Sequence, residues 1–217
     1  MKRLLPTLAA LALVIAAGAW YSGRPATQAL VLPALGQDAG EVELVPDVVL
    51  GDPDAPVTVI EYASYTCPHC SHFYLDQAKQ LKANYVDTGK VKFIHREVYF
   101  DRFGLWGGLL AHCGGDLRYH GLSGLIYEKQ KEWIGSGDPD EIIANLTTLG
   151  KSAGLSEDQI DTCLNDTEMA TRLVATFQEQ AGADEINATP TLIIDGKKYS
   201  NMGYDALAKI IDERLAD

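Results

Sequence analysis

The sequence predicts an α/β fold, a mixed sheet flanked by helices with an inserted all-helical domain. Two apolar, β-branched runs at residues 57–63 and 91–99 enclose a segment with helical spacing. A β-α-β crossover of this kind joins parallel strands. A third apolar run at 191–194 appears only after a long helical pattern, and Asp195-Gly196 follows it. Such a two-residue turn joins antiparallel strands, so the sheet is expected to be mixed.

The first two strands and the helix between them have clear sequence boundaries. Residues 57–63 follow the breaker segment 52–56 and are typical of a buried central strand, in which Glu61 is the one carboxylate. The helix is predicted to begin at the segment that starts with Cys67 and to end at Thr88-Gly89. Its predicted apolar face consists of Tyr74, Ala78, Leu81 and Tyr85.

The segment 101–184 shows helical patterns throughout and forms the predicted insertion. Asp138-Pro139 is typical of a helix start, and residues 156–159 form a capping box at the start of another helix. The apolar stripes of the insertion are Leu122, Leu125 and Ile126; Ile142, Ile143, Leu146 and Leu149; and Met169, Leu173, Val174 and Phe177. After the returning strand at 197–199, the stripe of a terminal helix is Leu207, Ile210, Ile211 and Leu215.

The N-terminus has the pattern of a secretory signal peptide. Lys2 and Arg3 precede an apolar run, and Ala17-Gly18-Ala19 is a small-x-small cleavage site. An uncleaved anchor helix is the alternative, although a membrane-spanning helix needs about 20 apolar residues. The predicted organisation is a signal peptide at 1–19, a linker or N-terminal arm at 20–46, the sheet-containing domain at 47–100 and 185–217, and the helical insertion at 101–184.

Length and composition are typical of a globular protein and disfavour one class of partner. The 217 residues suffice for one sizeable domain that carries an insertion. The formal net charge of −12 disfavours nucleic-acid binding, because an acidic surface repels phosphate. Export would place the four cysteines in an oxidising compartment.

The candidate site is Cys67-Pro68-His69-Cys70, at the predicted helix start. Two cysteines at this spacing can form an S–S bond, and the helix N-terminus stabilises a thiolate on the first. Pro68 fits the first turn, where no N–H donor is needed, and His69 adds a donor or a positive charge beside the thiolate. C-x-x-C beside a β-α-β unit therefore predicts a thioredoxin-like redox site, with Cys67 exchanging with substrate and Cys70 resolving. Half of a zinc site is the alternative, but no second C-x-x-C pair supports it, and no metal is expected.

The CPHC motif, the preceding strand with Glu61 and the helical insertion together resemble the DsbA family of bacterial periplasmic thiol oxidases over residues 45–217. Thr189-Pro190, ahead of the third strand, is a further marker. The resemblance implies that this proline is cis and packs against the active-site disulfide. It also implies that Thr189 contacts the sulfurs and offers its backbone to a substrate peptide. No cofactor is implied beyond the redox-active disulfide Cys67–Cys70.

Glu61 lies six residues before Cys67, where the family carries a buried acid. The resemblance therefore implies that Glu61 relays protons to or from Cys70. Its apolar neighbours favour a buried carboxyl over a strand-edge glutamate that points to water. The family often has a second acid seven residues after the first cysteine, but this chain has Tyr74 there.

The remaining cysteines and histidines fall outside the motif. A structural disulfide between Cys113 and Cys163 is predicted, and two buried thiols or a regulatory disulfide that tunes the active site are the alternatives. His95, His112 and His120 have no ligand-like spacing, and we expect them to be surface or hydrogen-bonded core residues.

These features predict a periplasmic thiol:disulfide oxidoreductase, a monomer that introduces disulfides into unfolded or reduced exported proteins. The resemblance implies reoxidation by a DsbB-like membrane partner linked to quinone. A disulfide isomerase or reductase on the same fold is an alternative, although the Pro/Gly-punctuated arm makes a poor oligomerisation stalk. A Cu(I)-binding module is another, but the chain has only three methionines to help such a role.

Overall fold

The computed structural model of the protein describes residues 42–216. The predicted signal peptide and most of the predicted arm therefore lie outside the described residues. Within 42–216, no helix combines the length and the hydropathy that a membrane crossing requires.

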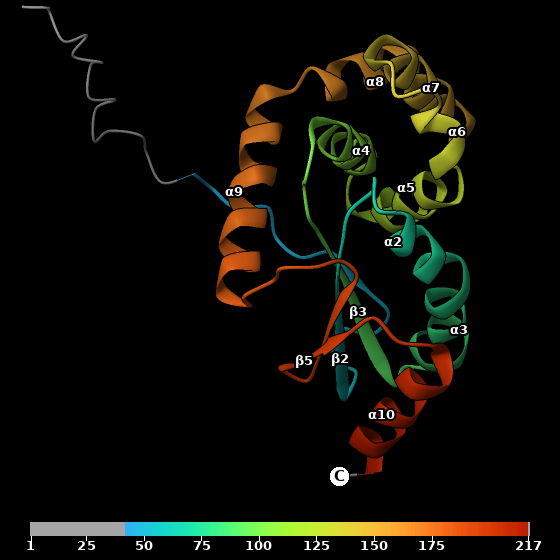
Figure 1. The fold of residues 1–217 in the computed structure, drawn as a ribbon, viewed down its shortest axis with the longest axis vertical. Coiled ribbons are helices and arrows are strands. Elements are labelled where there is room, and N and C mark those ends of the chain that lie inside the picture. Colours follow the sequence, from blue (N-terminus) through green and yellow to red (C-terminus); the bar gives the residue numbers. More distant parts are fainter. Residues whose placement is uncertain (1–41, 217) are drawn as a thin grey trace, which may run out of the picture. The chain divides into compact units, whose positions relative to one another are not determined.

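A five-stranded sheet with the order β1-β3-β2-β4-β5 lies at the centre (Figure 1). Strand β2 (Val57–Ala63) pairs parallel with β3 (Val91–Glu97) and antiparallel with β4 (Thr191–Ile194). The hairpin from β4 into β5 (Lys197–Ser200) and the short edge strand β1 (Val49–Leu50) complete it. The mixed sheet and its buried central strand are as predicted. The strand predicted at 91–99 ends at Glu97, because Glu97 pairs with Ala63, the last residue of its parallel partner β2.

One helical rod follows β2 and lies against the sheet. Its consecutive segments are α2 (Pro68–Phe73), η1 (Tyr74–Ala78), α3 (Lys79–Leu81) and η2 (Lys82–Val86). The two η segments are π-helical turns, which the apolar spacing did not predict. Phe73 and Leu81 of the rod pack with Leu207 and Ile211 of α10 (Tyr204–Ala216), so the rod and α10 share one core with the sheet.

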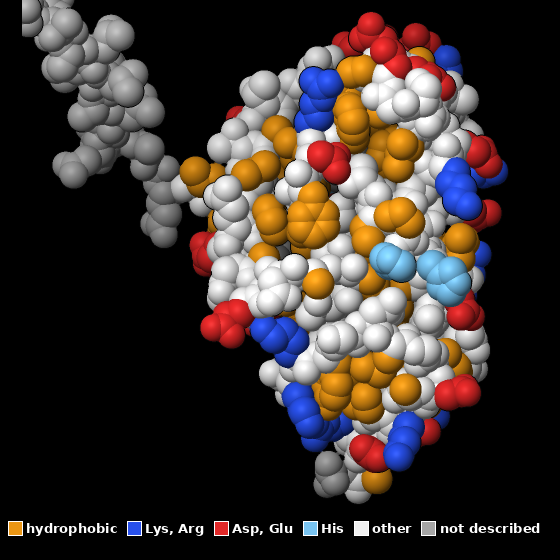
Figure 2. Space-filling view, in the orientation of Figure 1, with side chains coloured by type: hydrophobic (Ala, Val, Ile, Leu, Met, Phe, Trp, Pro, Cys, Tyr) orange, Lys and Arg blue, Asp and Glu red, His pale blue; other side chains and the backbone are white. Residues whose placement is uncertain are grey.

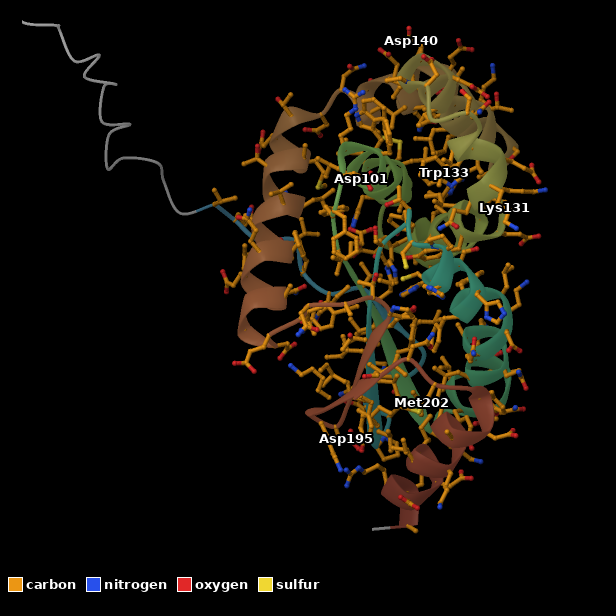
Figure 3. The ribbon with its side chains drawn as sticks, in the orientation of Figure 1. Asp101, Lys131, Trp133, Asp140, Asp195 and Met202 are labelled. Atoms are coloured by element: carbon orange, nitrogen blue, oxygen red, sulfur yellow. A yellow bond between two sulfur atoms is a disulfide. The ribbon has the colours of Figure 1, made fainter. Side chains whose placement is uncertain are left out.

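The helical insertion has its own core beside the CPHC segment. Its helices are α4 (Arg102–His112), α5 (Asp116–Glu128), α6 (Gln130–Ile134), α7 (Pro139–Ser152) and α8 (Glu157–Leu164). Leu110, Ile126 and Trp133 are buried together in this core, and Trp133 is labelled in Figure 3. The side chain of Asp138 caps α7 and the capping box starts α8, as the sequence predicted.

Helix α9 (Thr167–Ala183) returns from the insertion to the sheet (Figure 1). Its Ala181 and Phe177 pack with Tyr62 and Ile193. Tyr62 alternates with Glu61 along β2, so α9 covers the sheet face opposite to the one that Glu61 faces. The last helix of the predicted insertion thus also forms a layer of the sheet-containing domain.

A disulfide joins Cys113, at the end of α4, to Cys163 in α8, with the two Cα atoms 5.6 Å apart. It closes a loop between residues that are 50 positions apart in the chain. A cross-link of this span restrains the unfolded chain and so stabilises the folded state.

We expect the double substitution Cys113→Ala/Cys163→Ala to lower the free energy of unfolding by about 2–4 kcal/mol. The comparison is made by urea unfolding, with both proteins carrying Cys67→Ser/Cys70→Ser so that only this disulfide differs. Equal free energies of unfolding would show that the bond contributes nothing to stability.

Candidate active site

Cys67 and Cys70 lie at the start of α2 in different surroundings. Cys67 is the N-cap residue, with an extended backbone, and Pro68 occupies the first turn. The Cys67 N–H donates to the Ser64 carbonyl at 3.0 Å, which forms the turn between β2 and α2. Cys67 is half-buried, whereas Cys70, one turn further along, is fully buried, and both are free thiols. Only the first sulfur is therefore accessible to another protein.

The surroundings of Cys67 favour its ionised form. The peptide bond between Thr189 and Pro190 is cis, and the neutral Cys67 thiol donates to the Thr189 carbonyl at 3.6 Å, a contact that the thiolate loses. Partial burial opposes a charge on the sulfur, but hydrogen bonds from the Thr189 side chain and from the backbones of Cys70 and His69 outweigh it. The pKa of Cys67 is therefore lowered.

Glu61 and Cys70 form the buried side of the site. Glu61 is 2% exposed, and its Oε1 atom has no hydrogen-bond partner among the described residues. Burial, followed by the negative charge on Cys67, raises the pKa of Glu61 to about 8. Burial, followed by the charge on Glu61, also raises the pKa of Cys70. The site thus pairs an easily ionised outer sulfur with an inner thiol and carboxyl that hold their protons.

An open groove of about 540 Å³ runs past the exposed end of the motif. Its walls are His69, the loop residues 187–191 that contain the cis proline, and residues 198–201 at β5. Figure 2 shows histidine side chains over α2 on this face, with hydrophobic side chains beside them. The groove is therefore open to an extended peptide that passes next to Cys67.

A second cavity, of about 340 Å³, lies between the helical rod, β3 and α5. Glu61, Tyr74, His95 and Tyr127 are among its lining residues. Tyr74 stacks on Tyr127, with ring centroids 5.6 Å apart. Tyr74, seven residues after Cys67, therefore forms part of the wall of this cavity.

A buried polar cluster centred on Glu97 was not predicted. The Glu97 carboxylate accepts hydrogen bonds from the Tyr65 hydroxyl at 2.8 Å, the Tyr119 hydroxyl at 3.2 Å, His112 at 3.2 Å and the Tyr99 hydroxyl. Burial opposes the charge, but His112 and the hydrogen bonds outweigh it and lower the pKa of Glu97 to about 2. The cluster therefore holds a buried negative charge close to Tyr65, two residues before Cys67.

His95, His112 and His120 are hydrogen-bonded, which is one of the two settings expected for them. His95 lies between the hydroxyls of Tyr119 and Tyr127, at 2.8 and 2.9 Å, and burial lowers its pKa to about 4. His112 pairs with Glu97, and His120 contacts the Val48 carbonyl at 2.9 Å. Within residues 42–216, His, Cys and carboxylate side chains form no group of three or more placed to hold a metal ion.

Comparison with known proteins gives concordant matches. A family model described as thioredoxin matches residues 43–213. A Rickettsia prowazekii relative whose name includes protein-disulfide oxidoreductase is 31% identical over 172 residues, which cover 79% of this chain and 62% of the relative. Disulfide bond formation protein D of Bacillus subtilis is 29% identical over 193 residues, which cover 83% of each chain.

Two solved structures have the same fold. Wolbachia pipientis alpha-DsbA1 superposes with a TM-score of 0.74 and 26% identity, over 81% of this chain and 94% of that chain. A protein-disulfide isomerase from Novosphingobium aromaticivorans superposes with a TM-score of 0.72 and 26% identity, over 80% of this chain and 100% of that one. The matched region thus spans the whole fold, although it covers less than two thirds of the Rickettsia relative.

The raised pKa of Glu61 predicts a pH-dependent stability. The folded carboxyl keeps its proton up to about pH 8, whereas the unfolded chain loses it from about pH 4.5, so the unfolded state binds fewer protons between these values. Stability therefore falls as pH rises through this window. Glu61→Gln removes the titration, and we expect it to stabilise the reduced protein by about 2–4 kcal/mol more at pH 8 than at pH 5.

Urea unfolding of the reduced protein at the two pH values measures this difference. Glu179→Gln is the matched control, because the Glu179 side chain is exposed, and it should affect both values equally. An effect of Glu61→Gln that does not depend on pH would contradict a buried, protonated carboxyl.

Proposed function

The chain belongs to the thioredoxin family, whose model matches residues 43–213, and a DsbA protein is among the solved structures that share its fold. From this we propose that it is a DsbA-like thiol:disulfide oxidoreductase that introduces disulfide bonds into other proteins. The observation that carries the proposal is the opposite shift of the two thiols: the pKa of Cys67 is lowered and that of Cys70 is raised. A stabilised outer thiolate favours the reduced form of the enzyme, and its disulfide is then a strong oxidant.

The reaction begins with the oxidised enzyme, in which Cys67 and Cys70 are joined. A substrate thiolate attacks the Cys67 sulfur, the only accessible one, and forms a mixed disulfide. The Cys67–Cys70 bond breaks and its electron pair remains on Cys70. A second substrate thiolate then attacks the substrate sulfur of the mixed disulfide, and Cys67 leaves as a thiolate. Two electrons pass from the substrate to the enzyme, and the substrate gains a disulfide.

The lowered pKa of Cys67 supports the second step, because a sulfur of low pKa is the better leaving group. Cys70 requires the reverse, since a buried thiolate is costly and must take up a proton as it forms. We assign this proton to Glu61, which is protonated at neutral pH and is buried behind the motif. The cavity that Glu61 lines gives its carboxyl space in which to exchange the proton with solvent.

The substrate is held by the groove beside the cis proline. In this proposal Thr189 and Pro190 offer the loop backbone to an extended segment, and His69, which follows Pro68 in the first turn of α2, borders the groove from the helix side. The loop's carbonyl at Thr189 already faces Cys67, so a peptide bound there places its cysteine next to that sulfur. Such main-chain recognition accepts many sequences, as a general oxidase requires.

The cellular setting follows from the sequence pattern. We assign the protein to the periplasm, with unfolded or reduced exported proteins as substrates and the Cys113–Cys163 disulfide as a structural cross-link. A membrane partner of the DsbB type, linked to quinone, would accept the two electrons and restore the Cys67–Cys70 disulfide. No bound cofactor is needed, because the disulfide itself carries the electrons.

Refolding of ribonuclease distinguishes an oxidase from an isomerase. We expect the oxidised protein to introduce disulfides into reduced ribonuclease with one substrate disulfide made per enzyme disulfide consumed, and to act poorly on scrambled ribonuclease. Cys67→Ser should abolish the reaction. The Cys67 thiolate of Cys70→Ser should attack a disulfide of scrambled ribonuclease, release one substrate thiolate and remain as a mixed disulfide, because no Cys70 thiol is present to resolve it.

The Cys113→Ala/Cys163→Ala variant is the control, since it removes cysteine sulfurs outside the motif and should still oxidise reduced ribonuclease. Faster action on scrambled than on reduced ribonuclease would favour an isomerase. Inactivity on both would refute the proposed function.

A further inference from the structure

Gln130, the first residue of α6, is a buried polar side chain that contacts the backbone of the active-site turn. It is 4% exposed, and its Nε2 amide donates to the Tyr65 carbonyl at 2.8 Å and to the Cys67 carbonyl at 2.9 Å. Both N–H groups of one amide are thus used on two carbonyls that lie on either side of Thr66. A residue of the insertion thereby spans the turn that leads from the sheet into α2.

The Gln130 amide has a different effect on each of the two carbonyls, those of Tyr65 and Cys67. Tyr65 lies between β2 and α2, so neither the strand ladder nor the helix supplies a partner for its carbonyl, and the Gln130 amide does. The Cys67 carbonyl already accepts the Cys70 N–H at 3.1 Å and the Ser71 N–H at 3.2 Å. It is therefore the first acceptor of the α2 hydrogen-bond ladder, and Gln130 fixes its position relative to the preceding strand.

The side chain of Tyr65 is held by the same insertion and by the end of β3. Its hydroxyl contacts Ser123 of α5 at 2.8 Å and Glu97 at 2.8 Å. Its ring packs so closely on Gly107 of α4 that a Cβ atom added there would lie 3.2 Å from the ring atoms Cγ and Cδ2. Both the backbone and the side chain of Tyr65 are thus fixed. Because the same Gln130 amide also bonds the Cys67 carbonyl, it holds Cys67 at a set position relative to Tyr65.

We propose that Gln130 is a positioning residue, which holds the first turn of α2 in register with the Thr189 loop and so sets how strongly the Cys67 thiolate is stabilised. The proposal rests on the proposed function in taking Cys67 as the exchanging sulfur. The backbone groups of His69 and Cys70 that stabilise the thiolate belong to the turn that Gln130 fixes. Hydrogen bonds weaken steeply with misalignment, so a small movement of this turn reduces their effect on the sulfur.

Trp133 provides a matched comparison for a purely structural role. It lies in the same helix α6, is 1% exposed and donates its indole N–H to the Ile126 carbonyl at 2.9 Å. Its hydrogen bond is as buried as those of Gln130 but does not reach the CPHC turn. Trp133→Phe therefore removes one buried hydrogen bond from α6 without altering the contacts of Tyr65 or Cys67.

The test measures the pH dependence of Cys67 alkylation by iodoacetamide in the reduced protein, together with the thermal midpoint. Gln130→Met keeps the side-chain length and removes both donors. We expect it to lower the acid dissociation constant of Cys67 by about threefold to tenfold, seen as a shift of the alkylation profile to higher pH. Trp133→Phe should lower the thermal midpoint and leave the profile unchanged.

Gln130→Asn keeps an amide but withdraws it by one methylene, so it cannot span both carbonyls. We expect the same direction of shift from it, and it supplies the measurement if Gln130→Met does not fold. An unchanged profile, or a shift to lower pH, in the Gln130 variant that folds would overturn the proposal.

Alkylation needs no protein substrate, so this test is separate from that of the proposed function. If the wild-type protein fails to oxidise ribonuclease while the Gln130 variants shift the profile, the function is wrong and the positioning role stands. If the wild-type protein oxidises ribonuclease and the profile does not shift, the positioning role alone is wrong.

Discussion

A negative charge on the Cys67 sulfur is stabilised at the first turn of α2, where the Thr189 side chain and the backbones of Cys70 and His69 face it. These groups come from opposite ends of the chain and meet only because β2 and β4 are neighbours in the sheet. Burial of Glu61 and Cys70 on the inner side has the opposite effect and keeps both protonated. In the proposed function, this difference between the two sulfurs decides which one exchanges with substrate, which one resolves and in which direction electrons pass.

The insertion contributes to this arrangement as well as covering the motif. The buried charge of Glu97 is balanced by His112 of α4 and by the hydroxyls of Tyr119 in α5 and of Tyr99, which follows β3. Tyr65 joins this cluster to the turn before Cys67. Gln130 holds the same turn through its carbonyls. A buried charge with several partners requires those partners to keep their places, because losing one leaves a costly unpaired group. Polar contacts thus join the sheet-containing domain to the insertion next to Cys67, and the residues that make them can move little without losing a partner.

Local patterns in the sequence predicted most of the fold. The apolar run around Glu61, the Asp195-Gly196 turn and the caps at Asp138 and Ser156 depend on neighbouring residues, so each could be recognised from the sequence. The π-helical turns could not, because one wider turn hardly changes the spacing of apolar residues. The Glu97 cluster and Gln130 could not either: their partners are distant in the chain, and nothing in the polar run around Gln130 indicates burial. The residues proposed to carry the chemistry could thus be named from the sequence, while those that hold them in place could not.

The central claim is that stabilisation of the Cys67 thiolate makes the Cys67–Cys70 disulfide an oxidant. The reduction potential of this pair, measured by equilibration with glutathione, tests it most directly. We expect a value less negative than about −180 mV, which is that of protein disulfide isomerase. A value near about −270 mV, that of thioredoxin, would mean that the disulfide is the more stable form and that the protein acts as a reductant.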